Sequence, residues 1–263
     1  MDLGLKDKPV VVTGGSSGIG LATARLLLEE GAQVAICARG AERLDKVAAD
    51  FADTFGVDRV FAQAVDVLQE EQVNGFARAV EDRFGGAVAL INNAGQGRVS
   101  TFAETTDEAW REELELKYFS QIRPIRAFQN MLAASGSGAI VATNSLLALQ
   151  PEPHMVCTSS ARAGIQNLLK SLARELAPAI RVNSILVGLI DSNQWQRRFE
   201  ARDDKNQTRE AWYADLAKNK NIPMGRLGKP EEAARLLAFL ASPAASFITG
   251  AQVEISGGIS RFI

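Results

Sequence analysis

Short apolar runs rich in β-branched residues alternate along this chain with longer segments in which apolar residues recur at helical spacing. Leu21, Ala24, Arg25 and Leu28 illustrate that spacing. Repeated alternation of this kind is typical of strand–crossover–strand units, which form a parallel sheet covered on both faces. Seven runs are predicted to be strands: Pro9–Thr13, Gln33–Ala38, Val60–Val65, Val88–Ile91, Ala139–Thr143, Arg181–Val187 and Gln252–Ile255.

The length and composition fit one large α/β domain. The chain has 263 residues, 46% of them hydrophobic and 23% charged, which is enough to bury a full core and excludes disordered and fibrous classes. No linker or low-complexity segment interrupts the alternation. We therefore predict a single domain over residues 1–263 with a doubly wound, seven-stranded parallel sheet. Only the charged, aromatic segment from about 191 to 222 departs from the pattern, and helices or a loop are expected there.

Charge and cysteine content exclude several classes of partner. The net charge is −2 and the pI about 5.7, so no global positive field is available for nucleic acid or an anionic membrane. Cys37 and Cys157 lie far apart and form no metal-binding cluster, as expected for core thiols in a reducing compartment. The first eight residues show no signal-peptide pattern, and no apolar run approaches the roughly 18 residues of a membrane span. We expect a cytoplasmic protein without a metal.

A glycine-rich turn follows the first predicted strand. Gly14, Gly18 and Gly20 have the spacing Gly-x-x-x-Gly-x-Gly, and a helical segment over 21–30 follows at once. Glycines let the backbone turn tightly and approach a diphosphate, and the helix N-terminus adds free amides and the positive end of its dipole. A purely structural turn is the alternative. The candidate contacts to a dinucleotide are Gly14, Ser16, Ser17, Gly18, Ile19 and Gly20.

Residues Thr13 to Gly20 resemble the Thr-Gly-x-x-x-Gly-x-Gly signature of the short-chain dehydrogenase/reductase family. The resemblance continues over essentially the whole chain, through Asp66, Asn92-Asn93-Ala94-Gly95, Arg181-Val182-Asn183, Thr249-Gly250 and Gly257-Gly258. It implies a Rossmann fold, hydride transfer between a nicotinamide and a carbonyl or alcohol, and a homo-oligomer, either a tetramer or a dimer. It also implies further cofactor contacts at Asp66, Val67, Asn93, Ala94, Gly95, Arg162, Gly188 and Ile190.

The residues after the second predicted strand favour NADP(H). Folds that bind NAD usually place an acidic side chain there to accept hydrogen bonds from the ribose 2′-hydroxyl. This chain has Ala38, which cannot accept them, followed by Arg39, whose guanidinium can pair with a 2′-phosphate. The alternative is that Arg39 is a solvated loop residue.

The catalytic positions depart from the family pattern of Asn, Ser, Tyr and Lys. The two tyrosines, Tyr118 and Tyr213, are not followed four residues later by lysine, so no Tyr-x-x-x-Lys pair exists. Alignment on the helix that precedes Arg181-Val182-Asn183 places other residues at the four positions. They are Lys117, Ser145, Thr158 and Arg162.

These replacements differ in their chemical consequences. Arg162, one helical turn beyond Thr158, retains a positive charge that can bind the nicotinamide ribose. Thr158 cannot simply replace the phenol as an acid, because an aliphatic hydroxyl, like water, is a far weaker acid than a phenol, which titrates near 10. Threonine is also shorter, so the vacated space is expected to hold water or a small anion. Lys117 is the leading proton donor, because burial and nearby Arg162 should lower its pKa.

Three other groups near these positions are alternative proton donors. His154 could overhang the substrate and supply the proton, but a solvated loop histidine is the favoured interpretation. Cys157 is adjacent to Thr158 and is expected to point about 100° away, into the core. Tyr118 is adjacent to Lys117 and is expected to point elsewhere.

The segment over 191–222 resembles the mobile substrate lid of the family. It contains the aromatics Trp195, Phe199, Trp212 and Tyr213 and the cations Arg197, Arg198, Arg202, Lys205 and Arg209. Together with Lys117 and Arg162 they suggest an organic, anionic substrate such as a carboxylate. A solvated helix face is the alternative, since Glu200, Asp203, Asp204, Glu210 and Asp215 offset the charge. Two functions remain open: an NADP(H)-dependent oxidoreductase, or an NADP(H)-binding regulatory or sensor protein with little turnover.

Overall fold

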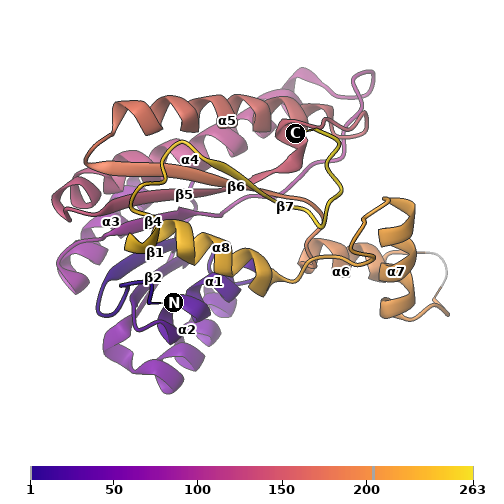
Figure 1. Cartoon of the computed structure of the whole chain (residues 1–263). Coiled ribbons are helices and arrows are strands. Elements are labelled where there is room, and N and C mark those ends of the chain that lie inside the picture. Colours follow the sequence, from indigo (N-terminus) through magenta and orange to yellow (C-terminus); the bar gives the residue numbers. More distant parts are fainter. Residues whose placement is uncertain (1, 203–204, 263) are drawn as a thin grey trace.

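A parallel sheet with strand order β3-β2-β1-β4-β5-β6-β7 forms the centre of the molecule (Figure 1). The structure is a computed structural model that describes residues 2–202 and 205–262. Within these residues the sheet has seven strands: β1 Pro9–Thr13, β2 Gln33–Ala38, β3 Val60–Ala64, β4 Ala89–Asn92, β5 Gly138–Ser145, β6 Ile180–Val187 and β7 Gln252–Ile255. The predicted doubly wound fold is confirmed.

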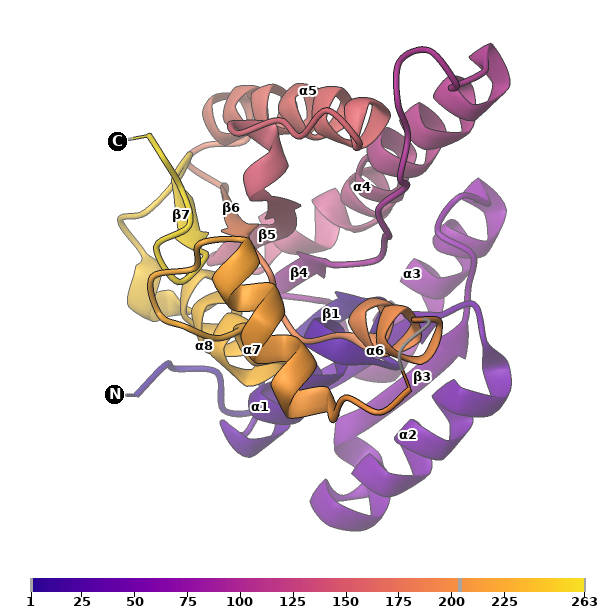
Figure 2. The same ribbon diagram turned by 90° about the vertical axis from the view of Figure 1, so that its right-hand side faces the viewer.

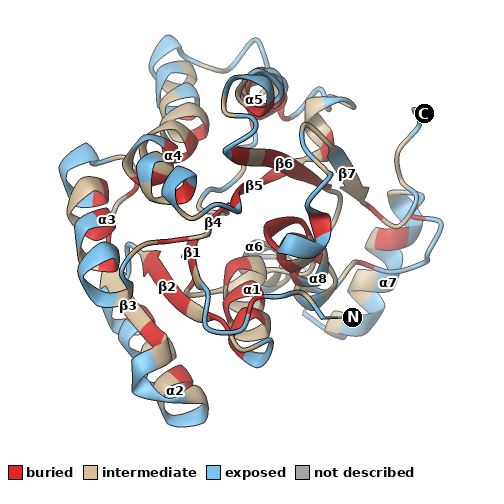
Figure 3. Cartoon of the chain, turned by 60° about the vertical axis from the view of Figure 1, so that its left-hand side comes forward, coloured by how far each residue is buried: buried red, intermediate tan, exposed pale blue. Residues whose placement is uncertain are grey.

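Helices cover both faces of the sheet (Figures 1 and 3). Val10 and Val12 pack into one apolar core, whereas Val11 between them packs into the other, as the two-residue period of a strand requires. The helices facing the first core are α1 Gly18–Glu29, α2 Ala41–Phe55 and α8 Pro230–Ala241. Those facing the second are α3 Glu70–Phe84, α4 Asp107–Ala134 and α5 Val156–Glu175. Helices therefore cover both faces of the sheet, and polar functional groups are expected at the ends of the strands.

The chain reverses its direction of progress across the sheet between β1 and β4. From β1 it proceeds outward through β2 to β3, then returns to place β4 on the other side of β1. The connections that leave the carboxyl ends of β1 and β4 therefore run in opposite directions across the sheet. Folds of this type bind ligands at such a topological switch point. Thr13 joins the two ends, because its Oγ1 accepts hydrogen bonds from the backbone N–H groups of Asn93 (3.0 Å) and Ala94 (3.1 Å).

The predicted strands all exist: β1, β2 and β7 have the predicted bounds, and the bounds of the other four shift by one or two residues. The largest shift concerns β5, which was expected to end at Thr143 and continues to Ser145. The extension follows from pairing with β6, whose Val187 lies opposite Ser145. Ser145 was expected just past the strand, and it is in fact the last strand residue.

The segment over 191–222, the predicted lid, forms two helices, α6 Asn193–Glu200 and α7 Arg209–Asn219, which stand apart from the sheet at its carboxyl edge (Figures 1 and 2). Asp191 attaches α7 to the end of β6: Arg209 Nη2 donates to both of its oxygens (2.8 and 2.9 Å), and the Tyr213 hydroxyl donates to Oδ1 (2.7 Å). Asp203 and Asp204, counted above among the offsetting charges, lie outside the described residues.

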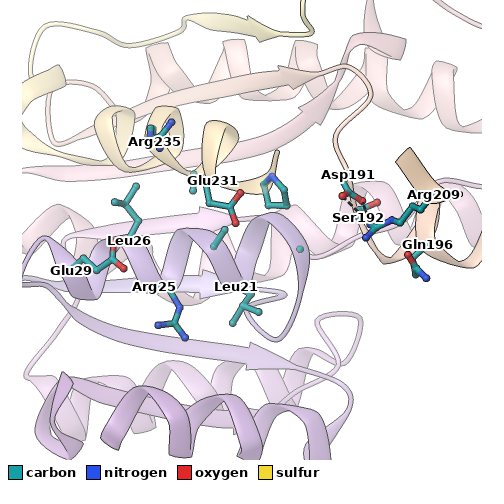
Figure 4. A pocket seen from close by; sticks show the side chains of 14 residues that line it. Leu21, Arg25, Leu26, Glu29, Asp191, Ser192, Gln196, Arg209, Glu231 and Arg235 are labelled. Atoms are coloured by element: carbon teal, nitrogen blue, oxygen red, sulfur yellow. Dashed lines mark hydrogen bonds and ion pairs between the residues drawn. The ribbon is translucent and has the colours of Figure 1, made fainter. Parts of the chain in front are cut away.

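A cavity of about 590 Å³ lies between α1, α8 and the start of the lid (Figure 4). Its charged lining side chains carry both signs: Arg25, Glu29, Asp191, Arg209, Glu231 and Arg235. Arg25 is also paired with Asp50 (2.6 Å) and Arg209 with Asp191. Because these charges balance, this cavity offers no field that would select an anion or a cation.

Candidate active site

A second and larger cavity, of about 930 Å³, lies along the carboxyl edge of the sheet. It extends from Arg39, after β2, past the glycine-rich turn to Ser145 at the end of β5. All the candidate cofactor contacts except Gly20 line it: Gly14, Ser16, Ser17, Gly18, Ile19, Arg39, Asp66, Val67, Asn93, Ala94, Gly95, Arg162, Gly188 and Ile190. The structure thus brings together residues that are distant in sequence.

Gly20 lies behind the cavity lining and acts through packing. A Cβ atom at this position would lie 2.2 Å from the carbonyl oxygen of Gly14 and 2.5 Å from Asn93 Nδ2. Only glycine lets the first turn of α1 approach the end of β1 this closely. Gly20 therefore shapes the turn and does not itself face the cavity.

Two arginines line the end of the cavity beside β2. Arg39 was expected there, and Arg43 in the first turn of α2 joins it. Sequence reasoning did not single out Arg43, although its position four residues after Arg39, just past the predicted strand end, is a usable signal. Glu42 and Asp66 line the same end, and Glu42 is paired with Lys46, so the two guanidinium groups are what this end offers to a phosphate group.

Ser145, Thr158 and Arg162 line the opposite end of the cavity. Arg162 Nη1 donates to the Thr143 carbonyl oxygen (3.0 Å), whereas its buried Nε has no hydrogen-bond partner among the described residues. Burial lowers the pKa of Arg162 to about 10, and nearby Glu113 partly opposes that shift. The site therefore holds a desolvated positive charge with hydrogen-bonding capacity to spare.

Lys117, the fourth expected member, lies behind the cavity and does not line it. Its side chain is 3% exposed, and its Nζ donates to the Gln96 carbonyl oxygen (2.6 Å) and to Glu113 Oε1 (2.7 Å). Burial, followed by repulsion from Arg162, lowers the pKa of Lys117 to about 8, while Glu113 opposes the shift. The expected direction of the shift and both of its expected causes agree with the structure.

Glu113 is a functional candidate that sequence reasoning missed. Its carboxylate is 2% exposed, and Oε1 accepts a hydrogen bond from Thr158 Oγ1 as well as from Lys117. Thr158 Oγ1 in turn accepts a hydrogen bond from the backbone N–H of Arg98 (3.1 Å). The four-residue spacing of Glu113 and Lys117 on one helix could have indicated their pairing. The hydrogen bond between Glu113 and Thr158 could not have been predicted from sequence spacing, because it joins α4 to α5.

The three alternative donors occupy different environments. His154 lines the cavity and remains half exposed. Cys157 is fully buried, as is Cys37, whose pKa is raised to about 12 by burial; both are free core thiols as expected. Tyr118 points toward α5, where its hydroxyl lies 1.7 Å from the position that a Cβ at Gly164 would occupy. Of the three, only His154 can reach a molecule in the cavity.

The lid aromatics contact one another more than they contact the cavity. Trp212 packs against Trp195, Phe199 and Tyr213 with ring centroids 5.5 to 6.3 Å apart, and among the four only Trp195 lines the cavity. Arg197, Arg198 and Lys220 line the same region. An aromatic cluster thus joins α6 and α7, and cations of the segment over 191–222 line the cavity.

Comparison with known proteins places this architecture in a family. A family model described as enoyl-(acyl carrier protein) reductase matches residues 14–260. A 3-oxoacyl-(acyl carrier protein) reductase from Vibrio cholerae is 33% identical over 258 residues, covering 98% of this chain and 99% of that protein. The chain belongs to the short-chain dehydrogenase/reductase family.

Solved structures of that family superpose over nearly the full length. A short-chain oxidoreductase from Pseudomonas aeruginosa, described as containing an atypical catalytic center, is 58% identical with a TM-score of 0.95 in its apo form, over 98% of this chain and 99% of that one. Its NADPH-bound form gives a TM-score of 0.93 at 57% identity, with the same coverage. L-sorbose reductase from Gluconobacter frateurii, complexed with NADPH and L-sorbose, is 35% identical with a TM-score of 0.95, and both chains are fully covered.

Proposed function

We propose that this protein is an NADPH-dependent oxidoreductase that interconverts a carbonyl group and a hydroxyl group on a small molecule, with Lys117, Ser145, Thr158 and Arg162 in place of the usual catalytic set. The observation that carries the proposal is the single cavity that joins the glycine-rich turn to Ser145, Thr158 and Arg162. The NADPH complexes of the Pseudomonas and Gluconobacter relatives support the choice of cofactor.

The residues that line the cavity fit NADPH. The close approach at Gly20 leaves backbone amides at the start of α1 for a diphosphate, and Arg39 with Arg43 suits a 2′-phosphate. At the other end, Arg162 Nε and Thr143 Oγ1 are buried polar atoms without partners among the described residues, and both residues line the cavity. Bound NADPH would supply a hydride, and these groups would orient its nicotinamide end.

The chain's own residues account for the remaining chemistry. Ser145 would hydrogen-bond the carbonyl oxygen, and Arg162 would stabilise the negative charge that develops on it. Lys117 is the proton source. Because its pKa is lowered to about 8, it is protonated below that pH and neutral above it. The rate of carbonyl reduction should therefore fall as the pH rises through about 8.

The function can be tested with Ser145→Ala. We would follow NADPH oxidation with L-sorbose, a 3-oxoacyl thioester and simple ketones and aldehydes. Removal of one hydrogen-bond donor to the developing oxyanion is expected to lower turnover by about 10²–10³-fold while leaving NADPH affinity unchanged. Ser171→Ala, an exposed change on α5, is the matched control. Unaltered rates would contradict the assigned role of Ser145. Tight NADPH binding by the wild-type protein without turnover of any of these compounds would instead support the sensor function.

Arg39→Ala tests the cofactor preference. Loss of a charge-assisted contact to the 2′-phosphate is expected to raise the dissociation constant of NADPH by about 10-fold or more. The constant for NADH, which lacks this phosphate, should barely change. Arg78→Ala, at an exposed position of α3, serves as the control in the same titrations. Equal losses for both dinucleotides would refute a role for Arg39 in recognising the phosphate.

A further inference from the structure

The proton source and the cavity are separated in this structure, and the residues between them form a continuous hydrogen-bonded chain. Lys117 Nζ donates to Glu113 Oε1 at 2.7 Å, and the Thr158 hydroxyl donates to the same oxygen. Thr158 lines the cavity, whereas Lys117 does not. All three side chains are almost fully buried, at 3%, 2% and 1% exposed respectively.

We propose that Glu113 is a relay and positioning residue, which passes a proton from Lys117 to the hydroxyl of Thr158 while Thr158, its hydroxyl turned toward the cavity, passes its own proton through a water molecule to the substrate oxygen. This inference rests on the proposed oxidoreductase function. It explains how a chain without a catalytic phenol can use a threonine: Thr158 only exchanges one proton for another, so it never has to persist as an alkoxide.

The proton transfers balance as follows. After the carbonyl carbon accepts a hydride from the reduced nicotinamide cofactor, the carbonyl oxygen carries the electron pair of the broken π bond. That oxygen takes a proton from a water molecule in the space beside Thr158, and this water takes the Thr158 hydroxyl proton, which has turned from Glu113 toward the cavity. Thr158 Oγ1 then takes a proton from Glu113 Oε1. Glu113 Oε1 takes its proton from Lys117 Nζ, so Glu113 ends as a carboxylate and Lys117 as a neutral amine. The product is an alcohol, and Lys117 is later reprotonated by solvent.

Charged side chains and backbone groups hold the members of the relay in place. The charged groups that interact with Glu113 are Lys117 on the same helix, Arg162 on α5 and Arg98 on the loop after β4. The backbone of Arg98 holds Thr158 Oγ1, because its N–H donates to Oγ1 at 3.1 Å and its carbonyl oxygen, 3.3 Å away, is a second acceptor for the hydroxyl proton. Lys117 is in turn fixed by the Gln96 carbonyl oxygen. Both ends of the relay are thus anchored by backbone groups, and short proton movements suffice.

A first test is the titration of Lys117 in Glu113→Gln, which keeps the shape of the side chain and removes its charge. In ¹⁵N-lysine-labelled protein without cofactor, the Lys117 signal, identified by its absence in Lys117→Met, should titrate near pH 8 in the wild type. We expect its midpoint to fall by about one unit or more in Glu113→Gln, because an adjacent opposite charge is lost. Glu115→Gln, on the same helix but paired with Arg123, should leave the midpoint unchanged. An unchanged midpoint in Glu113→Gln would overturn the inference.

A second test separates a relay from mere tuning of the pKa. The wild type and Glu113→Gln are compared at pH 6, where Lys117 stays protonated, with whichever of the carbonyl compounds above the wild type reduces. The relay predicts that Glu113→Gln remains about 100-fold slower than the wild type at this pH. Recovery of the wild-type rate at pH 6 would show that Glu113 only tunes Lys117, and would overturn the relay.

Should Glu113→Gln fail to fold, Thr158 provides the same information. Thr158→Val keeps the shape and removes the hydroxyl, so turnover should fall about 100-fold, whereas Thr158→Ser should retain it. Equal turnover of the Val and Ser variants would overturn the relay. A wild-type protein that reduces none of the compounds would overturn the proposed function and the relay together, whereas wild-type turnover with unaffected variants would overturn the relay alone.

Discussion

Lys117→Met is expected to lower the free energy of unfolding by about 3 kcal/mol and to reduce turnover by about 100-fold or more. The stability loss arises because the substitution leaves Glu113 buried at 2% exposure without its ionic partner. The value lies at the lower end of the range for broken buried pairs, because the change also relieves the repulsion between Lys117 and Arg162. Urea denaturation and NADPH oxidation assays measure the two effects.

Two control variants separate stability from catalysis. Lys46→Met breaks the exposed Glu42–Lys46 pair, which has the same four-residue spacing, and should cost less than about 0.5 kcal/mol. The double variant Lys117→Met with Glu113→Gln removes both charges, so it should recover most of the lost stability while remaining inactive. A double variant as unstable as Lys117→Met would contradict the ionic explanation, and an active Lys117→Met variant would exclude Lys117 as the proton source.

Gly20→Ala is expected to destabilise the fold by about 1–3 kcal/mol and to weaken NADPH binding by about 10-fold or more. The added Cβ would meet the Gly14 carbonyl oxygen at 2.2 Å and Asn93 Nδ2 at 2.5 Å, and the oxygen belongs to backbone that cannot rotate away. The turn between β1 and α1 must then shift, which moves the amides that face the diphosphate. Thermal denaturation and fluorescence titration with NADPH report the two losses.

Gly75→Ala provides the matched control for this substitution. Gly75 lies inside α3, and the nearest atom to an added Cβ would be Arg78 Nη2 at 3.9 Å. Alanine is the better helix former, so this change should stabilise the protein by about 0.5–1 kcal/mol without altering NADPH affinity. If both glycine variants changed stability in the same direction, close packing would not explain the requirement for Gly20.

The fold and the cofactor end of the cavity could be predicted because their signals are local. Strand periodicity, the spacing of Gly14, Gly18 and Gly20, and the position of Arg39 each depend on a few consecutive residues. Parallel pairing then brings their strand ends to one edge without further information. The end of β5 was predicted at Thr143 and lies at Ser145, because the length of this strand depends on its pairing with β6.

The catalytic end could be predicted only in part, because its contacts join distant segments. The set of Lys117, Ser145, Thr158 and Arg162 follows from spacing along the chain, and three of the four line the cavity. The burial of Lys117 behind the backbone of Gln96 depends on the path of a loop, which no periodicity determines. The contact of Glu113 with Thr158 spans 45 residues between two helices. Geometry of this kind emerges only when α4 and α5 pack together.

Calorimetric titration of the purified wild-type protein with NADPH and with NADH tests the central claim most directly. If the cavity binds the diphosphate and the 2′-phosphate of the dinucleotide, we expect saturable binding of one NADPH per chain and clearly weaker binding of NADH. Absence of saturable binding with either dinucleotide would contradict the account.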